Sequence, residues 1–252
     1  MLVRGERIQG MSEIDVWDSS RPRPGRRFEP THELALHDLA AELSSHLRGA
    51  SRGLVRVREL AGPIGIPDLT ALVGDPGPLE ARLALEVPPL LNEIDSAISA
   101  TTYPQSPRSA AAVARALGWP EETILRRIPG LLRSGALVRS GEQSYTRPEA
   151  LRPVGQVVAI EAKVKDWRGA LMQARAYTVW ADNYVIVMGA LSPPSVAKLR
   201  DEVARDSGGL VVDGTWVVRP RRREVARSKR MWASEHFVAG LIGTDHQPSA
   251  TP

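Results

Sequence analysis

The sequence predicts an α/β protein with a mixed central sheet covered by helices, and with a separate helical module inserted into it. Three observations carry this prediction. Apolar, β-branched segments typical of buried strands alternate with segments of helical periodicity. A stretch from 88 to 150 has a different, mostly helical character. After it, the alternation of strands and helices resumes.

The first part of the pattern runs from about residue 30 to 87. Thr31 is a suitable cap for a helix over 31–48, where leucines recur at mostly helical spacing. Strands are expected over 53–60 and 66–73, separated by a Gly/Pro loop. Pro67 lies at the start of the second strand, where proline is tolerated.

The inserted module is expected to hold three helices and a hairpin. The helices are predicted over 90–100, 109–118 and 120–134. Gly118 ends the second helix, and Pro120 suits the first turn of the third. Segments 135–139 and 144–147 are expected to pair as the hairpin. This is the plan of a winged helix-turn-helix, and the stretch resembles bacterial winged-helix domains.

The second part of the pattern begins with a strand over 157–164. Asp166 caps an expected helix over 167–181, and a strand follows over 184–188. A helix over 195–206 and a hairpin of 210–212 with 215–218 complete it. The expected division is a flexible basic arm (1–29), the first part of the core (30–87), the inserted module (88–150), the second part of the core (151–220), and a basic C-terminal segment and tail (221–252).

Composition excludes several classes of protein. The 252 residues include no cysteine, which excludes disulfides, zinc fingers and thiol catalysis. No stretch approaches the roughly 20 apolar residues of a membrane span, so no membrane association is expected. The N-terminus lacks the apolar core of a signal peptide, and a cytoplasmic protein is therefore expected. A phosphate-binding G-x-x-x-x-G-K-[ST] loop is absent.

The charge favours a polyanionic partner. The net charge is +4, and lysine occurs only at 163, 165, 198 and 229. Arginine is thus the usual cation of this chain, which makes each lysine informative.

Glu161 and Lys163 stand out within the expected strand over 157–164. Side chains in a strand alternate between faces, so the two charges share one face. Burying them on so apolar a strand is costly unless they have partners. An acid and a base placed together there suggest a metal ion and an oxyanion.

The order of motifs resembles the PD-(D/E)XK nucleases, the superfamily of restriction endonucleases and archaeal-type Holliday-junction resolvases. Pro67-Asp68 followed by Glu161-Ala162-Lys163 is similar to the signature of that superfamily. Glu33 and the run from Arg58 to Gly62 resemble the opening of the resolvase-like branch. Gln173 and Tyr177 match its Q-x-x-x-Y signature. The resemblance covers about residues 31–74 and 154–190, and the long insertion departs from it.

The resemblance implies a restriction-endonuclease-like core and a Mg²⁺- or Mn²⁺-dependent DNA endonuclease. Asp68 and Glu161 would bind the metal, with the Ala162 carbonyl as a third ligand. Lys163 would orient water or offset charge on the phosphate. Gln173 and Tyr177 would line the site, and Glu33 would reach the metal through water. Cutting both strands of a duplex usually requires two active sites, and a homodimer would supply them.

DNA contacts are expected from the third helix, from the wing and from the basic run after residue 218. The residues are Thr123, Arg126, Arg127, Arg139, Arg147, Arg221 and Arg222. The charges of the third helix are mixed, and many winged helices bind proteins instead. The basic run is also typical of a solvated segment.

Each signal alone has an ordinary interpretation. Glu33 suits a first helical turn, Lys163 an edge strand, and Gln173 and Tyr177 a helix surface. A second hypothesis is therefore a DNA-binding regulator or assembly subunit with an inactive nuclease-like core. A third is a protein-interaction module without affinity for DNA or metal.

Overall fold

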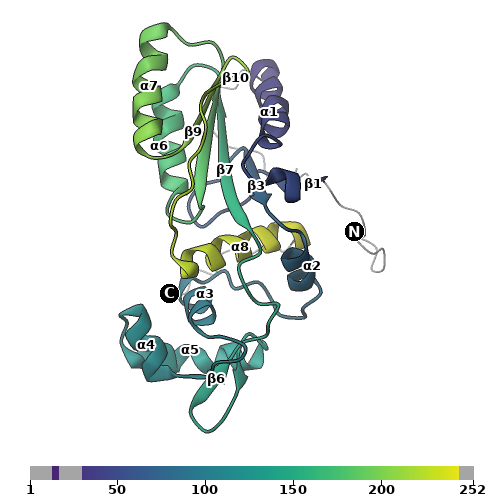
Figure 1. Ribbon diagram of the computed structural model, residues 1–252, viewed down its shortest axis with the longest axis vertical. Helices are drawn as coiled ribbons and strands as arrows, with labels where there is room; N and C mark the ends of the chain where they lie inside the picture. The colour runs from purple at the N-terminus through teal and green to yellow at the C-terminus, as the bar shows by residue number, and fades with distance from the viewer. Residues whose placement is uncertain (1–12, 17–29, 244–252) are drawn as a thin grey trace.

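The computed structural model describes the backbone of residues 13–16 and 30–243, and the side chains from residue 35 to 243. The fold is mixed α/β, with a mixed central sheet, as predicted. The sheet lies in one half of an elongated molecule, and a smaller helical unit lies in the other (Figure 1). Helix α8 runs between the two halves.

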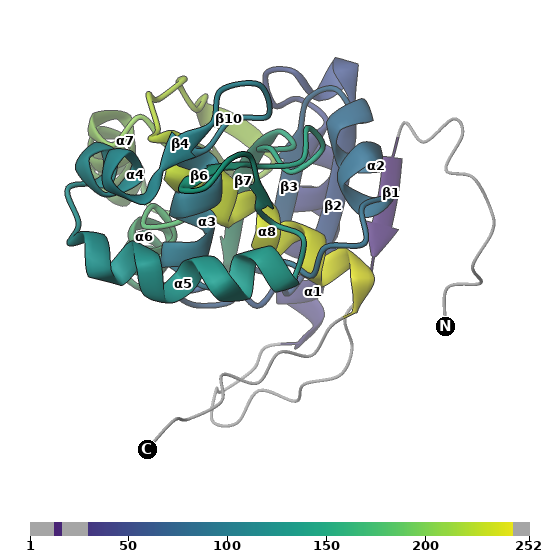
Figure 2. The same cartoon turned by 90° about the horizontal axis from the view of Figure 1, so that it is seen from below.

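The central sheet has seven described strands in the order β1-β2-β3-β7-β8-β9-β10. In Figure 2 the strands β1, β2, β3 and β7 follow one another from right to left in this order. β2 pairs antiparallel with β3, and β3 antiparallel with β7, whereas β7, β8 and β9 are parallel. The strands are β1 (Glu13–Val16), β2 (Leu54–Arg58), β3 (Leu69–Val73), β7 (Gln156–Lys163), β8 (Asn183–Met188), β9 (Gly209–Val212) and β10 (Thr215–Val218).

Alternation along β7 decides which element each side chain meets. Val158, Ile160 and Ala162 belong to the cluster formed with α1 (Pro30–Ser44). Val157 and Ala159 belong to the cluster formed with α8 (Arg227–Ile242) and the end of α6 (Trp167–Tyr177). Helix α7 (Pro193–Arg205) packs with α6 over β8 and β9. Because faces alternate, Glu161 and Lys163 lie on the face of α6 and α8.

The helical unit comprises residues 93–146 and lies in the chain between β3 and β7, which are adjacent in the sheet. Its elements are α3 (Glu93–Thr101), α4 (Ala110–Leu117), α5 (Glu121–Arg133), β4 (Arg108–Ser109), β5 (Val138–Arg139) and β6 (Ser144–Thr146). Asn92 caps α3, and Ser109 caps α4, each accepting a backbone N–H. Gly118 ends α4 in the left-handed region, at φ 69°. The unit has a hydrophobic cluster of its own.

The C-terminal segment differs from its prediction. Residues 221–252 were expected to form a basic segment and tail with a short helix, but α8 has 16 residues and a deeply buried centre. Phe237 packs under the sheet, while Met231 joins the cluster of the helical unit. The sheet covers one side of α8 and the helical unit covers another, and the charged Glu235 is buried between them. The helix therefore lacks the one-sided apolar pattern of an ordinary surface helix.

Two N-terminal elements were also missed. The arm assigned to residues 1–29 contains β1, which pairs in parallel with β2. The loop before the helical unit contains α2 (Gly77–Leu83). A four-residue strand and a seven-residue helix are too short to give a clear periodicity.

A buried ion pair joins α2 to α8. Arg82 and Glu235 are 1% and 0% exposed, and two guanidinium nitrogens donate to the carboxylate at 2.9 and 2.7 Å. The same carboxylate accepts the backbone N–H of Leu90 at 2.9 Å. Trp232 donates to the Leu91 carbonyl at 2.7 Å. Helix α8 therefore binds the chain at the point where it enters the helical unit.

We expect Arg82→Met to lower the free energy of unfolding by about 3–5 kcal/mol, because Glu235 would keep a buried charge without its counterion. Chemical denaturation followed by circular dichroism measures this loss. Arg115→Met on α4, where the side chain is exposed, is the matched control. Equal stability of the two variants would contradict a structural role for the pair.

Candidate active site

Asp68 is placed by the pairing of β3 with β7. It lies directly before β3, is 2% exposed, and accepts the backbone N–H of Ala162 at 2.8 Å through Oδ2. Leu69 pairs with Ile160 in the register of the two strands. The antiparallel direction then carries Asp68 toward Ala162 and its neighbours. Two segments distant in the chain thus meet at one edge of the sheet.

Lys163 connects the two acidic side chains. Its Nζ lies 2.7 Å from Glu161 Oε1 and 3.9 Å from Asp68 Oδ2. It also donates to the Ala162 carbonyl oxygen at 3.2 Å. Asp68, Glu161 and Lys163 therefore lie together, with the Ala162 carbonyl beside them. We call these three residues the carboxylate–lysine cluster.

The cluster contains two carboxyl groups and one ammonium. Burial raises the pKa of Glu161 above its usual range, and the nearby Asp68 carboxylate raises it further. Lys163 and the Tyr177 hydroxyl act in the opposite direction. Burial is thus the main cause of the raised pKa of Glu161, and repulsion by Asp68 is the second.

Tyr177 orients Glu161 from α6. Its hydroxyl donates to Glu161 Oε2 at 2.7 Å and lies 3.2 Å from the Ile66 carbonyl oxygen. Gly65 makes room for the ring: it has φ 73°, and a Cβ there would lie 2.8 Å from a ring carbon. Gln173 lies one turn earlier on α6 and is half-buried. No hydrogen bond of its side chain is found in the described part of the chain.

His37 is a further residue of the site that the sequence did not indicate. Its Nε2 lies 3.6 Å from Asp68 Oδ1. Its position in α1, four residues after Glu33, is the signal that could have indicated it, because such positions share a helix face. Glu33 itself lies in α1, and its side chain is outside the described residues.

The donor set suits a hard divalent cation. Two carboxylates and a backbone carbonyl are the oxygen ligands that Mg²⁺ prefers. Among the described side chains, no group of three or more His, Cys, Asp or Glu could hold a metal ion. Any site here would therefore combine Asp68 and Glu161 with the Ala162 carbonyl and water.

Arg147 does not have the exposed position expected of a DNA contact. It is 4% exposed and donates to the carbonyls of Thr102 and Leu151, the first at 3.0 Å. Burial, and then repulsion by Arg227, lower its pKa to about 10. The side chain instead joins the end of α3 to the segment leading to β7.

The other expected DNA contacts on the helical unit differ among themselves. Arg127 pairs with Asp95, with Nε 2.7 Å from Oδ1, and this hydrogen bond raises its pKa. Thr123 is half-buried and Arg126 exposed on α5. Arg139 is exposed on β5 and lies over the Tyr145 ring, 5.6 Å from the centroid. Arg126 and Arg139 are thus the accessible cations of this set.

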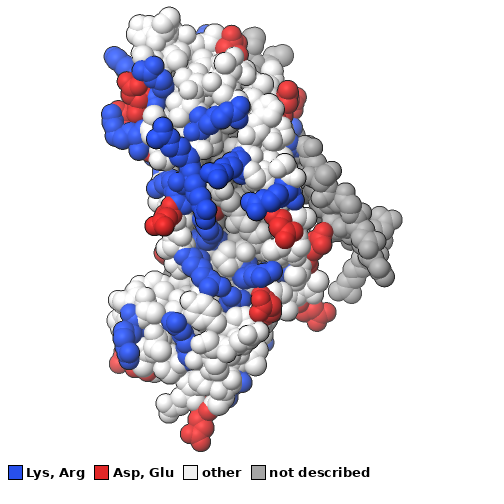
Figure 3. All heavy atoms as spheres, viewed as in Figure 1, with Lys and Arg blue, Asp and Glu red and all other residues white. Residues whose placement is uncertain are grey.

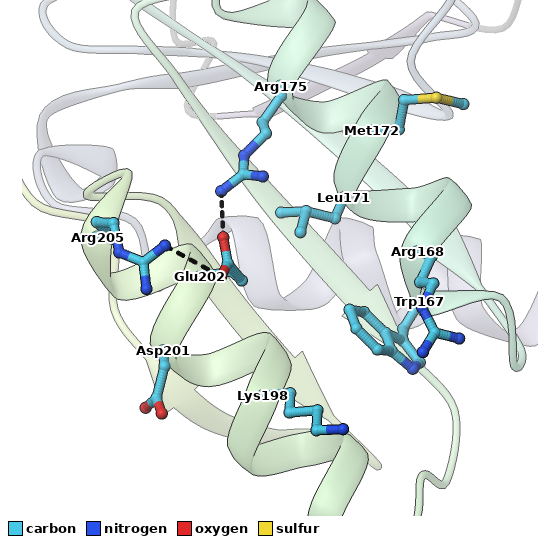
Figure 4. A pocket seen from close by; sticks show the side chains of 9 residues that line it. All are labelled: Trp167, Arg168, Leu171, Met172, Arg175, Lys198, Asp201, Glu202 and Arg205. Atoms are coloured by element: carbon cyan, nitrogen blue, oxygen red, sulfur yellow. Dashed lines mark hydrogen bonds and ion pairs between the residues drawn. The ribbon is translucent and has the colours of Figure 1, made fainter.

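An open pocket of about 600 Å³ lies between α6 and α7, apart from the carboxylate–lysine cluster (Figure 4). Two of its arginines pair with one acid. Arg175 donates to Glu202 at 2.7 Å, and Arg205 donates to the same carboxylate at 3.0 Å. Hydrogen bonds from these two arginines lower the pKa of Glu202. These ion pairs engage Glu202 and leave it unsuited to bind a cationic ligand.

Comparison of the chain with protein-family models, with curated proteins and with solved structures found no match. The described part of the chain holds no helix with the length and apolar character needed to cross a membrane.

We expect Lys163→Met to lower the free energy of unfolding by about 3 kcal/mol at neutral and higher pH, because it removes the ammonium that lies 2.7 Å from the buried Glu161 carboxylate. The folded-state pKa of Glu161 is already raised, and losing Lys163 raises it further. The deficit should therefore grow as the pH rises through that pKa and shrink as the pH falls toward the ordinary value of 4.5. Denaturant melts across this range measure it.

Lys165→Met is the matched control, since Lys165 is exposed two positions further along the chain. A pH-independent loss in Lys163→Met, or an equal loss in the control, would contradict the coupling of Lys163 to the carboxylates.

Proposed function

We propose that this chain is a Mg²⁺-dependent DNA endonuclease of the PD-(D/E)XK type, with a restriction-endonuclease-like core. One observation carries the proposal. Asp68 and Glu161, from two segments far apart in the sequence, both approach the Lys163 ammonium beside the Ala162 carbonyl. An arrangement of acid, acid and lysine at one sheet edge is what metal-assisted phosphodiester hydrolysis needs.

The arrangement of elements supports the same proposal. Helix α1, the antiparallel strands β2, β3 and β7, helix α6 and the parallel strand β8 follow the order expected of such a core. Asp68 directly precedes the second of these antiparallel strands, and Glu161 and Lys163 lie at the end of the third. Tyr177 reaches the site from α6, as the Q-x-x-x-Y signature implies.

Asp68, Glu161 and the Ala162 carbonyl would hold the metal, which when bound would lower the pKa of a water and polarise the phosphate. Two carboxyl groups beside a backbone carbonyl supply the oxygen ligands that a divalent cation takes. Tyr177 holds the Glu161 carboxylate in one orientation. Lys163 supplies a compact positive charge that orients water or offsets charge on the phosphate.

The helical unit is proposed to be a winged helix that positions DNA. Three helices followed by the β5–β6 hairpin support this assignment. Exposed Arg126 on α5 and Arg139 on the hairpin are its available phosphate or base contacts.

Cleavage of plasmid, branched and single-stranded DNA with Mg²⁺ or Mn²⁺ tests the proposal. We expect Asp68→Asn, Glu161→Gln and Lys163→Met each to reduce the rate by about 100-fold or more, since a charged group in such a site contributes about 3 kcal/mol to transition-state stabilisation. The rates are followed by gel electrophoresis of the products.

Glu149→Gln, which changes an exposed acid at the end of the helical unit, should cleave at the unmodified rate. Cleavage that survives Asp68→Asn and Glu161→Gln would show that another agent is responsible. It would overturn the proposal.

The depth of the cluster favours a second candidate function. Asp68, Glu161 and Lys163 are 2%, 1% and 7% exposed, so a phosphate reaches them only if the surrounding loops move. A DNA-binding regulator or assembly subunit with an inactive core would have no such need. Such a protein would bind DNA without metal and would cut no substrate. Mg²⁺ or Mn²⁺ would not raise its thermal stability. A gain in stability with either metal that is lost in Glu161→Gln would therefore argue against this candidate.

A further inference from the structure

Arginine side chains line a groove at the opposite end of the central sheet from the carboxylate–lysine cluster. The groove has a volume of about 520 Å³ and lies beside the end of β3 and the start of β7. Arg48 and Arg52 come from the segment after α1, and Arg221 and Arg222 from the segment after β10. We call these four residues the arginine groove.

The four side chains of the arginine groove are exposed. In the part of the chain that the structure describes, none of the four has a carboxylate within ion-pair distance. The other charged lining residues are largely engaged: Arg230 pairs with Asp182 at 2.7 Å, and the Asp75 carboxylate accepts the backbone N–H of Gly77 at 3.0 Å. The groove therefore differs from the α6–α7 pocket, where Arg175 and Arg205 are both paired with Glu202.

The backbone that carries Arg221 is held in place from within the sheet. Asn183 is 1% exposed, and its side-chain amide donates to the carbonyls of Arg221 and Ser207 at 2.8 and 3.1 Å. The Arg221 N–H donates to the Ser207 carbonyl at 3.0 Å. Pro220 packs where Gly209 lacks a Cβ. A fixed backbone lowers the entropy cost of presenting arginines to a ligand.

Positive charge continues beyond the groove. Arg108 and Arg227 each lie 4.9 Å from the centroid of the Tyr103 ring, at the boundary with the helical unit. Figure 3 shows Lys and Arg side chains gathered down the middle of the face that it draws, from the half that holds the sheet toward the helical unit, with fewer acidic side chains among them. An extended row of cations is suited to a linear polyanion rather than to a small anion.

We propose that the arginine groove binds the phosphate backbone of DNA without sequence preference and without metal. Guanidinium groups match phosphate oxygens in geometry and charge. Along β7 the groove and Glu161 are about 17 Å apart at ~3.3 Å per residue, which corresponds to roughly five base pairs of duplex. This last step rests on the proposed nuclease function: the groove would anchor the duplex away from the phosphate that is cleaved.

Binding of a fluorescent duplex by the full chain, measured by anisotropy at several salt concentrations, tests the proposal. We expect Arg48→Glu with Arg222→Glu to weaken binding at least about tenfold at ~100 mM salt, and to reduce the salt slope by about two. The control pair, Arg200→Glu with Arg205→Glu on α7, makes the same change in net charge outside the groove and should change affinity by less than about threefold.

Equal losses in the groove pair and the control pair, or no loss in either, would overturn the proposal. So would tight binding of heparin with no binding of DNA. Glu161→Gln should bind DNA as the unmodified chain does, so that failure of cleavage and failure of the groove are separate outcomes. Circular dichroism of both pairs checks that they are folded.

Discussion

The antiparallel pairing of β3 with β7 is the constraint on which the rest of the structure depends. It places Asp68 against the Ala162 backbone N–H and so beside Glu161 and Lys163. A shift of the register by one residue would turn both charged side chains toward α1 and its apolar cluster. The packing of β7 on two faces therefore protects the geometry of the carboxylate–lysine cluster.

The same pairing explains how the chain accommodates a long insertion. Residues 74–155 leave at the end of β3 and return at the start of the adjacent strand, so the sheet is not interrupted. Helix α8 then crosses between the halves, with the Arg82–Glu235 pair at the entry to the helical unit. A buried, fully hydrogen-bonded ion pair is specific in its geometry, which suits a contact that sets the position of one unit on another.

Charge is distributed differently at the two ends of the sheet. Near the carboxyl end of β7, two carboxyl groups and one lysine lie together in a buried site. At the amino end, exposed arginines line a groove beside the chain's return from the helical unit. A nucleic acid that contacts both ends of β7 would lie along that strand. Its phosphates would then meet the arginines at one end and the carboxylate–lysine cluster at the other.

Local patterns in the sequence predicted most of the strands and helices and the three residues of the cluster. Local periodicity and the strand alternation of Glu161 and Lys163 are properties of neighbouring residues, so they can be read without a structure. The contact of His37 with Asp68, the burial of Arg147 and the groove around Arg221 were decided by the tertiary structure alone. These depend on which distant segments pack together, and arginine's charge does not reveal whether a carbonyl, an acid or solvent will face it. The length and burial of helix α8 were not predicted for the same reason, because two separate partners cover the helix and leave no one-sided apolar pattern in its residues.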